Sequence, residues 1–289
     1  MQNSPIWIVV GLVAAFVLFS ERPEPVTPWR PIVPPLATPP SQPTQPQVLW
    51  IDYPALREIS NLGKVLSDIE SHMPAGHEYR SSDKITWAHE TTHGINSELR
   101  RKFQKGLVTS WDGQRYDEVF FADRINGFYC LEDRAVVITE PNTTIAAAAD
   151  LVPQSLQGVG YDLYMIQQRA DWNDTPLYIL DEWVAYTNGA ACARDLNLDG
   201  NSEVDRMVAF NVYAMAVAMA AKQDDPTYDD GQLKAFLMWS IERSFLLLRN
   251  ETSATDYIKG LQTASDAEAL RAFAREYFGK TWTQKTLGF

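Results

Sequence analysis

Cysteine is almost absent from this sequence, which holds only Cys130 and Cys192 in 289 residues. The two are not arranged as C-x-x-C, so a cysteine-based zinc site and a thioredoxin-like redox motif are excluded. They could form one disulfide if the domain lies outside the cytoplasm. They could equally remain two buried free thiols, because cysteine often behaves as a small core hydrophobe.

Positive charge is also scarce. The chain has 25 Lys and Arg against 37 Asp and Glu, and its formal net charge is −12. An acidic protein repels the phosphate backbone, so we expect no nucleic-acid partner. No internal repeat is found. The composition, 45% hydrophobic and 21% charged, suits one globular domain with accessory segments.

An apolar run without a charge, IWIVVGLVAAFVLF, covers residues 6–19. A membrane helix needs about 20 residues, and the flanking positions can extend the run toward that length. No basic residue precedes it and no A-x-A-like site follows it, which favours an uncleaved anchor in residues 1–22 over a removed signal peptide. Arg22 and Arg30 would favour a cytoplasmic domain by the positive-inside tendency. Because the run is placed like an export signal, we instead expect a membrane-anchored extracytoplasmic domain, or a secreted one if the run is cleaved.

Proline is concentrated directly after this run, where ten of the 17 prolines lie between Pro23 and Pro46. Each proline removes a backbone donor and restricts the residue before it, so residues 23–47 can hold neither a helix nor a central strand. The segment predicts a semi-rigid linker of at most ~3.1 Å per residue. It would hold a domain of residues 48–289 away from the membrane.

Hydrophobic spacing in residues 48–289 predicts an α+β domain that is mostly helical, with a small β-sheet. Helical spacing covers 56–69 and ends at the Pro-Ala-Gly of 74–76, and a second helix is expected from Asp83 to about Phe103, capped by Ser81 or Ser82. Strands are expected at 118–122, 128–131 and 135–139, the last two as a hairpin. From Thr144 onward the pattern is helical almost throughout, and the apolar run 207–221 predicts a buried helix.

The segment TWAHETTHGIN, residues 86–96, contains His89 and His93 four residues apart on the second helix. Residues at this spacing lie one turn apart on the same face, so both imidazoles can reach one tetrahedral metal ion. Glu90 is rotated by about 100 degrees, as the helical period requires, and can instead take a proton from a water on the metal. Asn96 shares the histidine face and could bond a ligand ring. His72 and His77 are expected to be exposed loop residues.

No third histidine follows at the spacing that would complete the site, so the remaining ligand should be a carboxylate on another helix. In TPLYILDEWVAYTNG, residues 175–189, Thr175 as cap and Pro176 start a helix. Glu182 lies on its apolar face, where a carboxylate is costly unless it is paired or bound to metal. The alternative is a buried ion pair, for example with Arg169. Asp181 is the second choice of ligand, pointing toward the wetter side.

HETTH followed some ninety residues later by DEWVAY resembles the gluzincin branch of zinc metallopeptidases. The resemblance implies a zincin-like fold, one catalytic zinc ion bound by His89, His93 and Glu182, and Glu90 as general base. Thermolysin-like members carry an aspartate four residues after the ligand glutamate, where this chain has Tyr186. Anthrax lethal factor-like members carry a tyrosine seven residues before it, where this chain has Thr175.

A zinc hydrolase also needs a donor for the developing oxyanion. Tyr178 and Tyr186 lie one turn either side of Glu182 on its face, so either could approach the metal, although buried tyrosines are more often core residues. We expect a membrane-tethered zinc metallopeptidase that cleaves a peptide or protein substrate. The alternative is a non-catalytic anchored binding or structural protein on a similar scaffold. The free edge of the predicted hairpin could bind a peptide by strand addition, though ordinary sheet structure is the simpler interpretation.

A second segment could bind a metal ion: DLNLDGNSEVD, residues 195–205, begins like a calcium loop. The twelfth position is Arg206, where a bidentate glutamate is needed, although Glu203 or Asp205 could substitute. A turn that leads into the next helix through Ser202 is the simpler interpretation.

Overall fold

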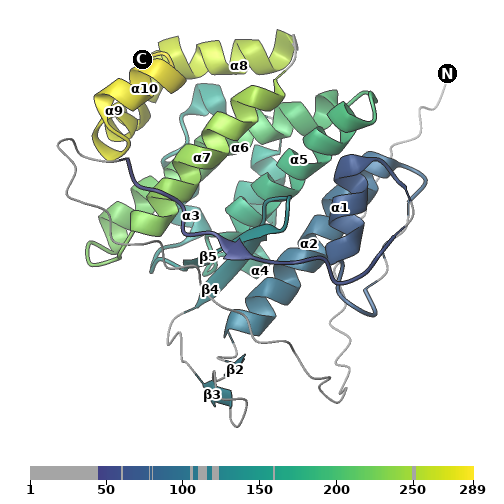
Figure 1. The fold of residues 1–289 in the computed structure, drawn as a ribbon. Coiled ribbons are helices and arrows are strands. Elements are labelled where there is room, and N and C mark those ends of the chain that lie inside the picture. The colour runs from purple at the N-terminus through teal and green to yellow at the C-terminus, as the bar shows by residue number, and fades with distance from the viewer. Residues whose placement is uncertain are drawn as a thin grey trace, which may run out of the picture.

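The computed structural model describes residues 45–59, 61–77, 79, 81–104, 107–109, 116–118, 124–158, 160–248 and 252–289. The expected anchor and nearly all of the expected linker lie outside these ranges, and residues 45–50 have no regular secondary structure. In this part of the chain the fold is α+β and mostly helical, as predicted (Figure 1).

The elements follow one another along the chain in the order β1 (Ile51–Asp52), α1 (Lys64–His72), α2 (Lys84–Gln104), β2 (Leu107–Thr109), β3 (Tyr116–Glu118), β4 (Ile125–Tyr129), β5 (Arg134–Thr139), α3 (Ile145–Asp150), α4 (Arg169–Trp172), α5 (Tyr178–Asp195), α6 (Asn201–Asp224), α7 (Gly231–Leu247), α8 (Thr252–Thr263), α9 (Glu268–Tyr277) and α10 (Lys280–Thr286). A π-helical segment, Asp162–Gln167, lies between α3 and α4.

The predicted hairpin is formed by β4 and β5, which pair antiparallel from Ile125 opposite Thr139 to Tyr129 opposite Ala135. With β1 they make a three-stranded sheet in the order β1-β5-β4, so β4 is an edge strand. β2 and β3 form a separate two-stranded ribbon. The strand expected at 118–122 overlaps β3 only at Glu118, and its remaining positions lie outside the described ranges.

Helix α2 packs along the edge of the sheet against β4. A Cβ at Gly127 would lie 2.5 Å from the Cβ of Leu99, so the glycine permits this close approach of helix and strand. The backbone N–H of Tyr129 donates to Asn96 Oδ1 at 2.7 Å, and its carbonyl accepts from Asn188 Nδ2 at 3.0 Å. At this residue the strand edge is therefore already hydrogen-bonded, and an added peptide strand has no partner there.

The predicted second helix is confirmed within a residue at each end, but its cap is different. Asp83, not Ser81 or Ser82, lies directly before α2 and accepts a hydrogen bond from Ile85 N at 2.9 Å. The first predicted helix was placed too early, because α1 begins only at Lys64. Gly63 precedes it with φ 93°, a left-handed conformation that ends the preceding segment rather than continuing a helix.

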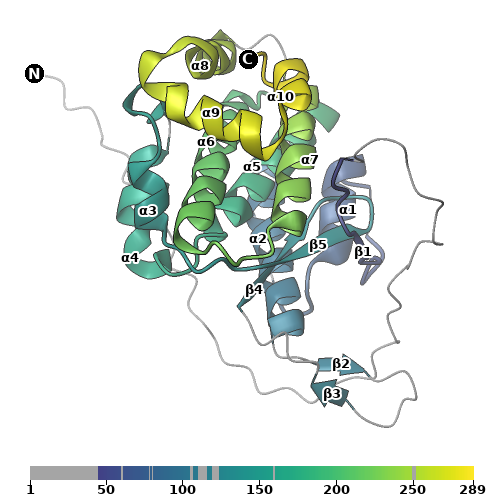
Figure 2. The same cartoon turned by 90° about the vertical axis from the view of Figure 1, so that its left-hand side faces the viewer.

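Helices α5 and α6 form the centre of the molecule and pack against each other (Figures 1 and 2). Helix α6 is long and apolar enough to cross a membrane, yet 83% of its apolar window is buried inside the protein, as predicted for 207–221. Helices α8, α9 and α10 lie together at one end of this layer, as Figure 2 shows. Cys130 and Cys192 are both buried and free, so of the two sequence alternatives the free thiols are found.

Candidate metal centre

Helices α2 and α5 bring together the three side chains that the sequence singled out as metal ligands. His89 and Glu182 are buried and His93 is half-buried, and one donor atom from each lies within 4.8 Å of the others. The α2–α5 contact is the most extensive between two helices in the described chain. Because α5 is apolar around most of its circumference, it is buried on nearly every side, and Glu182 is carried into the core with it.

The separations of the donor atoms are close to those of a tetrahedral site. His89 Nε2 and His93 Nε2 are 3.2 Å apart, and Glu182 Oε2 lies 3.8 Å from the first and 3.6 Å from the second. Ligands about 2.0–2.2 Å from zinc in tetrahedral geometry are separated by about 3.3–3.6 Å. The separations of 3.2 and 3.8 Å lie just outside this range and that of 3.6 Å lies at its edge, so the three atoms are close enough to share one metal ion after a small adjustment.

The ring of His93 is held from its other side. Its Nδ1 lies 2.8 Å from Asp181 Oδ2, and Asn96 Nδ2 donates to Asp181 Oδ1 at 2.6 Å. A proton on Nδ1 satisfies this contact and leaves the Nε2 lone pair directed at the shared centre. Asp181, the second choice of ligand, is thus the carboxylate that orients His93, and Asn96 bonds that carboxylate rather than a ring.

The ring of His89 has an equivalent partner that the sequence did not indicate. Its Nδ1 lies 3.2 Å from Oε2 of Glu203, in the first turn of α6. Glu203 entered the sequence analysis only as a substitute calcium ligand. No local pattern marks it, because the contact joins residues 114 positions apart.

Glu182 is oriented by Tyr178. The Tyr178 hydroxyl donates to Glu182 Oε1 and also contacts Gln168, which leaves Glu182 Oε2 facing the two histidines. Arg169, the example given for an ion-pair partner, is not among the ion pairs of Glu182 in the described structure, which are with His89 and His93.

Tyr186, the second tyrosine on this face, is also at the site. Its ring lies edge-on to that of His89 with 4.4 Å between the centroids, and its hydroxyl is hydrogen-bonded to that of Tyr164. Burial, reinforced by the nearby Glu182 carboxylate, raises the pKa of both Tyr178 and Tyr186. Both phenols therefore stay protonated and able to donate.

The charges of the cluster support one another. Burial opposes a positive charge on His93, but Asp181 and Glu182 outweigh it and raise the pKa of His93 well above its usual value. Burial would raise the pKa of Glu182, but His93 and then His89 keep it below its usual value. Without metal, the pair is thus an ionised carboxylate facing an imidazolium, and a bound cation would take the place of that proton.

Glu90 is half-buried on the neighbouring face of α2. On this face His77 packs over Gly94, where an added Cβ would lie 2.5 Å from His77 Nε2. Burial lowers the pKa of His77, Arg57 lowers it further, and Glu90 partly opposes both. His77 is therefore a half-buried neighbour of the Glu90 face, and the prediction that it is an exposed loop residue is wrong.

The same prediction was wrong for His72, which ends α1 and is fully buried. With Asp68 and Asp133 it forms a second group of potential ligands among the described residues. Here, however, both ring nitrogens are already bonded. His72 Nδ1 lies 2.6 Å from the backbone oxygen of Asp68, and Nε2 lies 2.8 Å from Asp133 Oδ1.

This second group holds the turn between β4 and β5. Leu131, Glu132 and Asp133 all have left-handed backbones, with φ of 68°, 58° and 57°. Asp68 accepts a hydrogen bond from Glu132 N at 2.9 Å and another from the Tyr129 hydroxyl at 2.8 Å. Three successive left-handed residues are strained, and these bonds from α1 account for their persistence.

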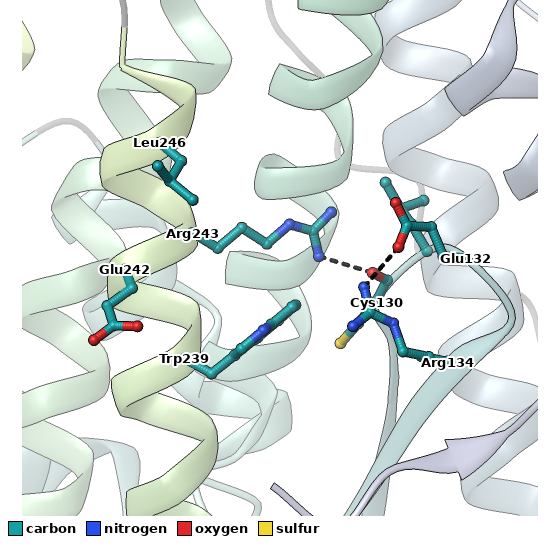
Figure 3. A pocket seen from close by; sticks show the side chains of 8 residues that line it. Cys130, Glu132, Arg134, Trp239, Glu242, Arg243 and Leu246 are labelled. Carbon is teal, nitrogen blue, oxygen red and sulfur yellow. Dashed lines mark hydrogen bonds and ion pairs between the residues drawn. The ribbon is translucent and has the colours of Figure 1, made fainter. Parts of the chain in front are cut away.

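A cleft of about 260 Å³ lies on the other side of this turn, lined by residues such as Arg134, Trp239 and Arg243. Figure 3 shows Arg243 reaching from α7 toward the hairpin, where it donates to the carbonyl of Cys130 at 2.9 Å. His89, His93 and Glu182 do not line this cleft.

The calcium-like segment does not gather its carboxylates. Asp195 Oδ2 accepts from Val65 N at 2.9 Å, and Asp199 Oδ1 accepts from Asn201 N at 3.1 Å. Neither belongs to a group of three potential ligands within the described ranges. The segment forms a turn into α6, although the cap position is Gly200 rather than Ser202. The cap expected at Thr175 is not found either, since α5 starts at Tyr178 with Glu140 Oε2 accepting from Leu177 N at 3.1 Å.

The described structure thus contains a buried group of two histidines and one glutamate that could hold a metal ion. Comparison with protein-family models, with curated proteins and with solved structures found no match for this chain.

Proposed function

We propose that this protein is a zinc-dependent peptidase with a zincin-like fold, in which His89, His93 and Glu182 bind the ion. The observation that supports this most is the separation of 3.2–3.8 Å between the two Nε2 atoms and Glu182 Oε2. Two imidazoles and one carboxylate with an open fourth position are the ligand set of catalytic rather than structural zinc.

A zinc ion in such a site lowers the pKa of a bound water to about 7 and polarises a carbonyl oxygen. Glu90, next to His89 on α2, would take the proton from the attacking water and later return it to the leaving amine. Because Glu90 is only half-buried, its side chain remains partly accessible to water.

The two tyrosines are the proposed donors to the developing oxyanion. Tyr178 is committed to Glu182, so its first contribution is to orient the ligand. The hydroxyl of Tyr186 has one hydrogen-bond partner in the described structure, the hydroxyl of Tyr164, and that bond can be exchanged for one to substrate. We therefore expect Tyr186→Phe to lower kcat by about 10²–10³-fold while zinc stays bound.

The test is to purify the chain with zinc, measure its metal content and follow cleavage of a mixed peptide library by mass spectrometry. Glu90→Gln should retain one zinc per chain and lose cleavage. Glu98→Gln is the matched control, because it makes the same change on the same helix at a side chain paired with Arg101 and Lys102.

The outcomes separate the proposal from its alternative. Zinc binding without cleavage of any peptide would favour a metal-containing binding protein. Cleavage that survives Glu90→Gln would show that the activity has another source, and a wild-type chain that takes up no zinc would refute the metal site itself.

Membrane attachment is a separate proposal, supported by the uncharged apolar run at residues 6–19. We infer that residues 1–22 anchor the domain and that it faces the extracytoplasmic side, where a peptide or protein substrate would reach it. The full chain should stay with membranes after alkaline carbonate extraction, whereas residues 45–289 should be released. Accessibility of the domain to protease added to intact cells tests its side.

A further inference from the structure

Glu203 and Gly189 form a contact that the proposed reaction does not explain. Glu203 lies on α6 and Gly189 on α5, and a Cβ at position 189 would lie 2.3 Å from Glu203 Oε2. Only a residue without a side chain fits beneath this carboxylate oxygen. The same oxygen lies 3.2 Å from His89 Nδ1.

The environment of Glu203 gives it no other evident role. The residue is buried, so an ionised carboxylate there needs a compensating partner. No arginine or lysine forms an ion pair with it in the part of the chain that the structure describes, and His89 is its one partner among the ion pairs found there. Its place in the first turn of α6 adds a favourable helix dipole.

We propose that Glu203 is the positioning residue for the metal ligand His89, and that Gly189 is present to admit its carboxylate. The inference rests on the proposed metal site. Glu203 Oε2 accepts the Nδ1 proton of His89, which fixes the tautomer and directs Nε2 at the metal position. The binding site then depends on three helices: α2 and α5 carry the ligands, and α6 sets the orientation of one of them.

The contact predicts a definite effect on metal affinity. An amide at position 203 can still reach Nδ1 but is a weaker acceptor, so the imidazole becomes a poorer and less fixed ligand. Loss of such outer partners weakens metal binding by about 10–100-fold. Gly189→Ala should have an effect in the same range, because the new methyl group displaces the carboxylate without removing it.

The experiment measures the zinc Kd of the full chain at neutral pH by competition with a chromophoric chelator, together with the Tm of the metal-free protein. The variants are Glu203→Gln, Gly189→Ala and the double variant. Glu276→Gln, an exposed acid on α9, and Gly231→Ala, where the nearest atom to the new Cβ is 3.4 Å away, are the matched controls.

Both single variants should bind zinc about 10–100-fold more weakly than wild type, and the double variant should be no weaker than the worse single one, because both act through one contact. Both controls should match wild type. A Kd within twofold of wild type in either single variant would overturn the inference. Gly189→Ala keeps the carboxylate, so it decides the matter even if Glu203→Gln does not fold. A wild-type chain that binds no zinc would instead refute the proposed function.

Discussion

Two groups of histidine and carboxylate side chains lie in the described structure, and they differ in what their nitrogen atoms face. At His89, His93 and Glu182 the outer polar atoms are bonded to neighbours, and three inner donor atoms face one another. At His72 the imidazole is bonded on both sides, to Asp68 and Asp133. The first arrangement leaves lone pairs for a cation, whereas the second uses them to hold a turn.

The comparison shows that proximity alone does not define a metal site. Both groups satisfy a distance criterion for three potential ligands. What separates them is whether hydrogen bonds from outside the group leave donor atoms free and directed at one point.

The largest effect is expected from removing one ligand. His93→Ala should weaken zinc binding by about a thousandfold or more, because the remaining imidazole and carboxylate no longer surround the ion. His72→Ala should keep one zinc per chain and lower the Tm instead. Metal content after dialysis against a weak chelator distinguishes the two. Loss of zinc from His72→Ala would mean that the second group also binds metal.

The next effect concerns the orientation of His93. Asp181→Asn should raise the zinc Kd by about 10–100-fold, since the amide oxygen is a weaker acceptor for the Nδ1 proton and fixes the ring less firmly. The matched change at the other group, Asp133→Asn, should leave the Kd unchanged. Equal Kd values for the wild type, Asp181→Asn and Asp133→Asn would show that Asp181 does not act on His93.

The third prediction is a pH dependence with a definite sign. In the metal-free protein the pKa of His93 is raised and that of Glu182 is lowered, so at neutral pH the proton that zinc must displace sits on His93. The affinity should increase about tenfold per pH unit up to the raised pKa of His93 and level off above it. Titrations between about pH 5 and 9 measure this. Asp181→Asn should move the plateau to lower pH, and an affinity independent of pH would contradict the assignment.

The smallest effect is expected on stability, from a change at the turn between β4 and β5. Tyr129→Phe removes the hydroxyl that donates to Asp68 Oδ1 at 2.8 Å. The free energy of unfolding should fall by about 1–2 kcal/mol, while the zinc Kd stays at the wild-type value. Chemical denaturation measures the first and chelator competition the second. A change in Kd would indicate that the two groups are coupled.

The group of His89, His93 and Glu182 was predictable because each of its residues stands in a recognisable short sequence pattern. Two histidines one turn apart and a glutamate on an apolar helix face can each be read from a short segment, and α2, the hairpin and the helical second half follow from spacing in the same way. The resemblance to gluzincins implied that these segments meet, and the helix contacts confirm that they do.

The remaining parts could not be predicted, because each depends on contacts between distant segments. His72 is buried only because β4 and its turn lie over the end of α1. Glu203 Oε2 lies beside His89 in the space that a side chain at position 189 would occupy. The late start of α1 depends on one left-handed glycine, which the apolar spacing of 56–69 does not reveal.

Asn96 has a consequence that extends beyond the cluster. One end of its amide receives the Tyr129 N–H from the sheet edge, and the other end donates to Asp181. Separation of β4 from α2 would break the Asn96–Tyr129 hydrogen bond and leave the Asn96 side chain less able to hold Asp181, the carboxylate that is bonded to His93. If the proposed site binds an ion, opening of the sheet edge and release of that ion would be linked, and slower hydrogen exchange of the Tyr129 amide would signal an occupied site.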